Sequence, residues 1–94
     1  MAQADEALKR YTSAYDRLTK AITERHKLVS RLEGLSLSVK VEAIQGGYVK
    51  LFNAPRAQGL INEISKLEEE ISSAVVDMNA HAALSRKPTI RTSN

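Results

Sequence analysis

Apolar side chains recur every three or four positions along the first third of the chain. The series steps 3-4-3-4 from Leu8 to Leu32 and is interrupted once, by Arg25. This spacing predicts a long amphipathic helix over residues 5–33, with Gly34 as the residue that ends it. Small residues form a second column beside the series, which widens the apolar stripe beyond the need of one partner helix. The series is Leu8, Tyr11, Tyr15, Leu18, Ile22, Val29 and Leu32, and the second column is Ala7, Ala14, Ala21 and Leu28.

Strict alternation of apolar and polar residues begins after Gly34 and continues through residue 43. A period of two predicts a strand. Gln45–Gly47 and then Tyr48–Phe52 follow, so the sequence predicts a β-hairpin over residues 36–52 with a three-residue loop. A two-residue Gly46–Gly47 turn is the alternative. The favoured register pairs Val41 with Leu51, Glu42 with Lys50 and Ala43 with Val49.

The second half of the chain predicts another amphipathic helix, over residues 55–84. Asn53 suits a helix cap and Pro55 suits the first turn, while Pro88 cannot continue the helix. Residues 85–94 are expected to form a polar basic tail. The helix stripe is Ala57, Leu60, Ile64, Leu67, Ile71, Ala74, Met78 and His81, widened by Ile61, Val75 and Ala82.

These elements predict a mainly α fold: an antiparallel two-helix coiled-coil hairpin with a β-hairpin at its tip, in a single domain over residues 1–84. One hairpin cannot cover both widened stripes, so we expect a homo-oligomeric bundle. Two explanations are open for the charged Arg25 within the apolar series. It reaches Glu63 or Glu68 beside the partner helix, or it serves specificity at an interface. The expected oligomer seam is Tyr11, Tyr15, Arg25, Leu28, Ile61 and Val75.

The α-β-β-α layout resembles that of small prefoldin-type subunits, in which a hairpin joins two antiparallel coiled-coil helices. The segments Gly47–Lys50 and Ile64–Ile71 are loosely similar to that family's hairpin and second helix. They cover about a quarter of the chain or less. The resemblance implies a helical-hairpin layout and is used as an analogy of architecture.

Composition narrows the class of protein. The chain has 94 residues, no cysteine and a formal charge of +3. A disulfide framework and a thiolate metal site are thereby excluded. Nothing in the N-terminal residues 1–10 is typical of a secretory signal, and no apolar run approaches the roughly 18–20 residues of a membrane span. We therefore expect a cytoplasmic protein without a membrane partner.

Reactive groups that could converge are few. His26 and His81 are expected to lie about 27 Å apart along the hairpin. The run Glu68–Glu70 points in different directions around its helix, and Gly46–Gly47 lacks the helix and lysine of a phosphate loop. The sequence predicts no enzyme, no cofactor and no metal site.

Binding surfaces are the better candidates. One face of the hairpin tip offers Ile44, Tyr48 and Phe52 beside Lys50, and this patch either binds a partner or packs onto the helices. A basic stripe on the first helix, together with the tail, could follow a phosphate backbone, although such residues also occur on ordinary solvated faces. These basic residues are Arg10, Arg17, Lys20, Lys27, Arg31, Arg86, Lys87 and Arg91.

The sequence therefore predicts a noncatalytic protein–protein interaction or assembly module that acts as an oligomer. Chaperone, adaptor, virion component and small inhibitor all fit this description. The alternative is a nucleic-acid-binding regulator that uses the basic stripe and the tail. A third hypothesis is a small anionic ligand bound between subunits near Tyr11 and Tyr15.

Overall fold

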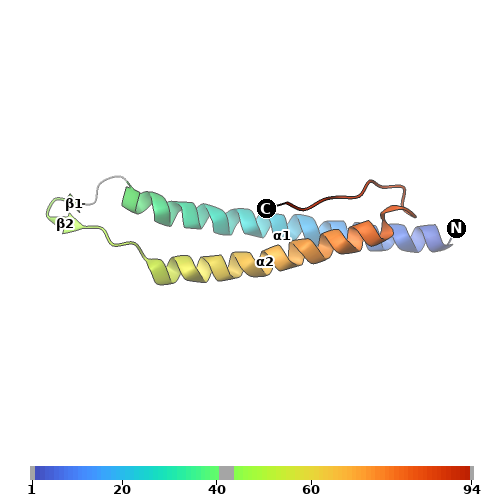
Figure 1. The fold of residues 1–94 in the computed structure, drawn as a ribbon, viewed down its shortest axis with the longest axis horizontal. Helices are drawn as coiled ribbons and strands as arrows, with labels where there is room; N and C mark the ends of the chain where they lie inside the picture. Colours follow the sequence, from blue (N-terminus) through green and yellow to red (C-terminus); the bar gives the residue numbers. More distant parts are fainter. Residues whose placement is uncertain (1, 41–43, 94) are drawn as a thin grey trace.

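Two long antiparallel helices lie side by side and form a rod of 72 × 19 × 17 Å in a computed structural model that describes residues 2–40 and 44–93 (Figure 1). Helix α1 spans Ala2–Lys40 and helix α2 spans Ala54–Ala82. Between them lie two short strands, β1 at Ile44–Gln45 and β2 at Tyr48–Val49. The mainly helical hairpin is confirmed.

Helix α1 is longer than expected, because it runs through Gly34 to Lys40. Leu35 and Val39 are half-buried. They continue the helical spacing of Leu28 and Leu32, so the same residues fit a strand period and a helix period. Helical continuation satisfies their backbone hydrogen bonds within α1, which a two-stranded ribbon does only in part. The strand expected over residues 36–40 is therefore wrong.

The tip is a much smaller β-ribbon than the expected hairpin. Ile44 pairs with Val49 and Gln45 pairs with Tyr48, so the loop has two residues. Gly46 and Gly47 have φ angles of 56° and 85°, which suit the left-handed turn that matches the twist of two strands. The loop is therefore the two-residue Gly46–Gly47 turn given as the alternative. The favoured three-residue loop, which uses a left-handed residue at one position only, is wrong. The expected positions of Val41, Glu42 and Ala43 lie outside the described residues.

Helix α2 begins and ends with defined caps. The Asn53 side chain accepts a hydrogen bond of 3.0 Å from the Arg56 backbone N–H, and Pro55 lies in the first turn. At the other end, the Lys87 N–H donates to the Ala82 carbonyl at 2.9 Å and the Arg86 N–H donates to Ala83 at 3.2 Å. This pair of bonds is a Schellman motif over residues 82–87. The regular helix ends at Ala82, within two residues of the expected Leu84.

The core lies between the two helices, in the half of the rod farther from the strands. It is built from one alanine-rich face of α1 and one apolar face of α2, and no buried polar or charged residue occurs among the described residues. Met78 is the largest side chain that is fully buried. The central cluster is Ala14, Leu18, Ala21, Ile71, Ala74, Val75 and Met78.

Candidate protein-interaction surface

The seam between α1 and α2 uses the alanine column. Ala7, Ala14 and Ala21 are at most 4% exposed, and Leu28 is also buried. Alanine lets two helix backbones approach closely, so α2 packs over this column and over the column of Tyr11, Leu18 and Arg25. The seam is therefore rotated by about 50° from the one expected.

This rotation leaves a column of large apolar side chains of α1 open to solvent. Leu8, Tyr15, Ile22 and Val29 are between 36% and 49% exposed. Successive members are seven residues apart and therefore lie in one line along α1, over about 32 Å. We call these four residues the α1 stripe. Single exposed apolar residues are ordinary, but a line of four is typical of an interaction surface.

The C-terminal segment, expected from the sequence to be a polar basic tail, is docked against the helices. It turns back after α2 and runs beside the helix pair (Figure 1), and Ile90 packs against the central cluster. Asn79 holds it by two hydrogen bonds of 2.8 Å: its side-chain oxygen accepts from the Ile90 N–H, and its amide donates to the Ile90 carbonyl. An apolar anchor and a main-chain clamp thus fix the segment.

Cross-helix ion pairs lie on the opposite side of the seam from the α1 stripe. The Arg17 guanidinium donates to Glu70 at 2.8 Å, to Asp77 at 2.6 Å and to the Ser73 hydroxyl at 3.2 Å. The hydrogen bonds to Glu70 and then to Asp77 raise the pKa of Arg17 above its ordinary value. This network fixes the alignment of the helices.

Arg25 donates to Glu68 at 2.9 Å, which confirms the expectation that it reaches an acidic residue beside α2. Several other basic residues proposed as phosphate contacts are also paired. Arg10 bonds Glu6 at 3.0 Å and Lys27 bonds Glu24 at 3.2 Å. Lys20 and Arg31, with the tail residues Arg86, Lys87 and Arg91, form no ion pair within the described part of the chain. Three of the eight basic residues, Arg10, Arg17 and Lys27, are thus engaged in ion pairs within the chain.

The residues expected at an oligomer seam separate into two groups. Leu28 and Val75 are buried within the chain itself and are not available to a second copy. Tyr11 is half-buried against the central cluster and Arg25 is paired with Glu68. Tyr15 and Ile61 stay 49% and 46% exposed. These residues differ from the expected oligomer seam because the seam within the chain is rotated and because Ile90 packs on the cluster containing Val75.

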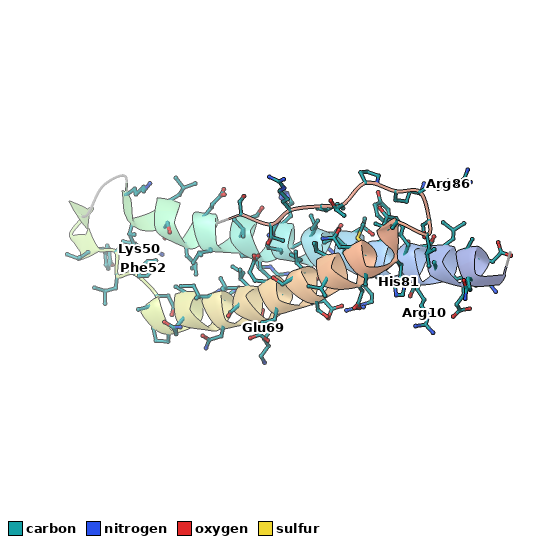
Figure 2. The ribbon with its side chains drawn as sticks, turned by 45° about the vertical axis from the view of Figure 1, so that its right-hand side comes forward. Arg10, Lys50, Phe52, Glu69, His81 and Arg86 are labelled. Atoms are coloured by element: carbon teal, nitrogen blue, oxygen red, sulfur yellow. The ribbon has the colours of Figure 1, made fainter. Side chains whose placement is uncertain are left out.

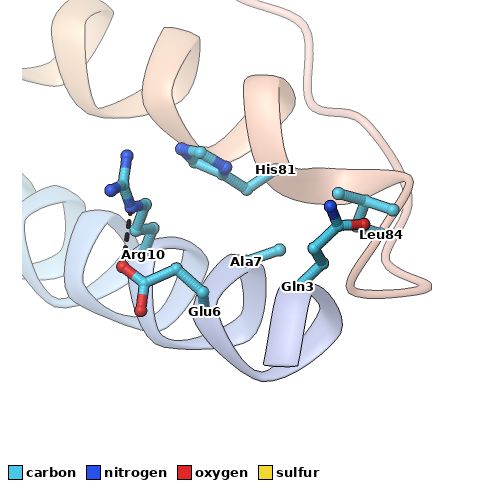
Figure 3. A pocket seen from close by; sticks show the side chains of 6 residues that line it. All are labelled: Gln3, Glu6, Ala7, Arg10, His81 and Leu84. Atoms are coloured by element: carbon cyan, nitrogen blue, oxygen red, sulfur yellow. Dashed lines mark hydrogen bonds and ion pairs between the residues drawn. The ribbon is translucent and has the colours of Figure 1, made fainter. Parts of the chain in front are cut away.

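A hollow of about 580 Å³ lies where the start of α1 meets the end of α2 (Figure 3). The His81 imidazole borders it opposite the Arg10–Glu6 ion pair. His26 lies 16 residues beyond Arg10 on α1, about 24 Å away along the helix. A two-histidine site within one chain is not formed, and the hollow holds no nucleophile beside a base.

A second hollow, of about 370 Å³, lies between α1 and the tail. Its walls include Tyr11, Tyr15 and Lys87. The third hypothesis placed an anion between subunits near these tyrosines, with arginines of the first helix. Here the cation beside them is a lysine of the tail, and the hollow lies within a single chain.

The tip projects from the end of the rod farthest from the turn at Arg86 (Figure 2). Tyr48 and Leu51 are 79% and 80% exposed, and Phe52 is 43% exposed. Neither strand packs on a helix in the described structure. Tyr48, Lys50 and Phe52 are therefore open to solvent, while the Ile44 side chain lies outside the described part.

Across residues 2–40 and 44–93, no helix is long and apolar enough to cross a membrane. No group of three or more histidine, aspartate or glutamate side chains is placed to hold a metal ion in the same residues.

The contact between Asn79 and Ile90 was not predicted from the sequence. Two features of the sequence point to these residues singly. Ile90 is the one large apolar residue in the tail, and Asn79 is a weak helix former placed beside the buried Met78. Neither signal says that the two residues meet, because the reversal at Arg86 is not encoded by a glycine.

No family model, curated protein or solved structure matches this chain. The resemblance of its layout to prefoldin-type subunits therefore carries no family assignment.

Proposed function

We propose that this protein is a noncatalytic, cytoplasmic protein–protein interaction module that works as a homo-oligomer. The observation that carries the proposal is the α1 stripe: Leu8, Tyr15, Ile22 and Val29 stay exposed in one line while the alanines beside them form the internal seam. Burial of such side chains stabilises association by up to roughly 1.5–3 kcal/mol each, less here because each is already about half-buried.

The residues next to the stripe favour a second copy as its partner. On the side away from α2, the stripe is bordered by Asp5, Thr12, Thr19, His26 and Glu33. The two threonines carry no charge, and the two acids lie at the ends of the stripe. Two α1 stripes can therefore face each other with little repulsion between like charges. Self-association buries the stripe of each copy against the same stripe of the other copy.

The exposed tip is a second surface for the same function. Tyr48 and Leu51 project at the end of the rod, where they are available to a different protein. In this arrangement the stripe assembles the oligomer, and the tips present several copies of one apolar patch. Multiple copies raise the overall affinity for a partner with several matching sites.

A matched pair of double variants tests the stripe. Ile22→Glu/Val29→Glu places two carboxylates in the stripe. Thr23→Glu/Ser30→Glu places the same charge at neighbouring positions that are also exposed and face away from α2. Sedimentation equilibrium should find the control associated and the stripe variant monomeric, with equal helix content by circular dichroism. Equal association of both variants would refute the stripe as the assembly surface.

A further inference from the structure

We propose that the docking site of the tail, which is formed by Asn79 and the cluster against which Ile90 packs and is called the groove below, is exchangeable. Its occupant in the assembled protein is the same segment, residues 87–93, of a second copy. The proposal deepens the proposed function, since it needs two copies to meet, but it does not require that the α1 stripe be the surface that joins them. The part that one copy inserts into the other is the tail, residues 87–93.

The groove recognises the main chain of its occupant. Asn79 binds both the N–H and the carbonyl of Ile90, at 2.8 Å each, as a neighbouring β-strand would. Among the described tail residues, Ile90 is the apolar anchor, and it packs against the cluster that contains Val75. An identical segment from another copy makes identical contacts, so exchange loses nothing at the groove.

Closure of the tail onto its own helices strains the turn. Arg86 has a φ of 55°, a left-handed conformation that disfavours side chains with a Cβ. The neighbouring Ser85 hydroxyl is buried, and no described residue forms a hydrogen bond with it. A tail that opens at residues 85–86 relieves both defects and gives up the two Schellman hydrogen bonds of the Arg86 and Lys87 N–H groups. Strain in a short hinge is the condition that favours exchange of an element between copies.

The position of the tail suits exchange with a neighbour along the stripe. Lys87 shares a hollow with Leu8, Tyr11 and Tyr15, so the tail and the α1 stripe lie on the same side of the rod. When two copies approach in parallel through this side, the tail of each is brought to the face of the other that carries Asn79. Figure 2 places Arg86, the hinge residue, toward the end of the rod opposite the tip.

Energy transfer between two labelled populations tests the proposal on the full chain. The protein has no cysteine, so a single introduced thiol carries each dye. A donor dye is attached at Thr92→Cys in the tail. An acceptor is attached at Ser72→Cys, which is exposed and lies one heptad before Asn79 on the same face of α2. The acceptor copy also carries Ile90→Asp, so it keeps its groove but loses the anchor of its own tail. The donor copy carries Asn79→Ala, so it keeps its tail but loses its own groove. The one intact combination is the donor's tail in the acceptor's groove.

Exchange predicts transfer between these two populations. It also predicts that adding Ile90→Asp to the donor copy weakens the apparent association at least about tenfold. Transfer that is indifferent to the donor's Ile90 would mean association without exchange and would overturn the proposal. Absence of energy transfer at protein concentrations of hundreds of micromolar would also overturn the proposal. It would do so even if a foreign peptide were found to displace the tail.

Two further variants separate this result from the test of the stripe. Repeating the experiment with Ile22→Glu/Val29→Glu in both copies shows whether tail exchange survives when the stripe is disabled. Arg86→Gly removes the strained φ without changing Asn79 or Ile90, so it should favour the closed tail and lower the exchanged fraction about fivefold. No change with Arg86→Gly would remove strain as the cause of exchange.

Discussion

The side chain of Asn79 and the main chain of Ile90 are joined by two hydrogen bonds, each 2.8 Å long, across eleven residues of sequence. One contact therefore converts the end of the chain from a free tail into a third layer beside the helix pair. It lies on the same side of the rod as the exposed α1 stripe, which places the two interaction features together.

Replacement of Asn79 by alanine should release the tail. Two net hydrogen bonds are lost, so the free energy of unfolding should fall by about 1–2 kcal/mol and hydrogen exchange at the Ile90 amide should become fast. Asn62→Ala is the matched control, because Asn62 is exposed on the same helix and bonds only Gln58 in the described structure. Continued protection of the Ile90 amide in Asn79→Ala would contradict the clamp.

Replacement of Arg86 by glycine should stabilise the protein. Glycine adopts a positive φ readily, so removing the Cβ should raise the free energy of unfolding by about 1 kcal/mol and the melting temperature by about 4–8 °C. Arg91→Gly removes the same charge at a tail position without a positive φ. A melting temperature no higher for Arg86→Gly than for Arg91→Gly would show that Arg86 is not strained.

The presence of both helices and the N-terminal cap of α2 could be predicted from the sequence because their signals are local. Asn53 and Pro55 mark the start of α2, and the spacing from Leu60 to Met78 marks its buried face. The end of α1 could not be predicted in the same way. Leu35 and Val39 fit both periods, and Gly34 lies within a helix although glycine often ends one.

The choice of seam depended on packing between helices. Both columns of α1 are apolar, and only the closeness allowed by Ala14 and Ala21 decides which column meets α2. The docked tail was equally hidden, because the turn at Arg86 has no glycine and the Asn79–Ile90 contact is not local. These are the features on which the candidate interaction surface depends.

Neutralising Arg17 should loosen the alignment of the helices. Arg17→Gln should lower the melting temperature more than Arg10→Gln does, because Arg10 pairs with Glu6 within one helix. The pKa of Arg17 is raised in the folded protein. The stability that Arg17 contributes is therefore complete at pH values below its ordinary pKa and is lost only as the pH rises through the raised pKa. Titration of Arg17 itself therefore adds no slope to its stabilising effect between pH 6 and pH 9.

Salt provides the control for this effect. The difference between Arg17→Gln and the unchanged protein should shrink at 1 M salt, where exposed ion pairs are screened. A difference that is independent of salt would mean that Arg17 acts through packing of its side chain.

Substitutions at the tip and in the core should have opposite consequences. Leu51 is 80% exposed and Met78 is fully buried. Leu51→Ser should leave the free energy of unfolding within about 0.5 kcal/mol, whereas Met78→Ala should lower it by about 2–5 kcal/mol. Chemical denaturation measures both. A large loss of stability in Leu51→Ser would mean that the tip packs within the folded unit.

The molar mass of the unmodified protein over a concentration series tests the central claim most directly. The chain has a mass of 10.4 kDa. Sedimentation or light scattering should find an integral multiple of that mass at tens of micromolar, falling toward the single chain on dilution. A folded particle of 10.4 kDa at every concentration up to hundreds of micromolar would contradict the claim that the α1 stripe assembles this protein.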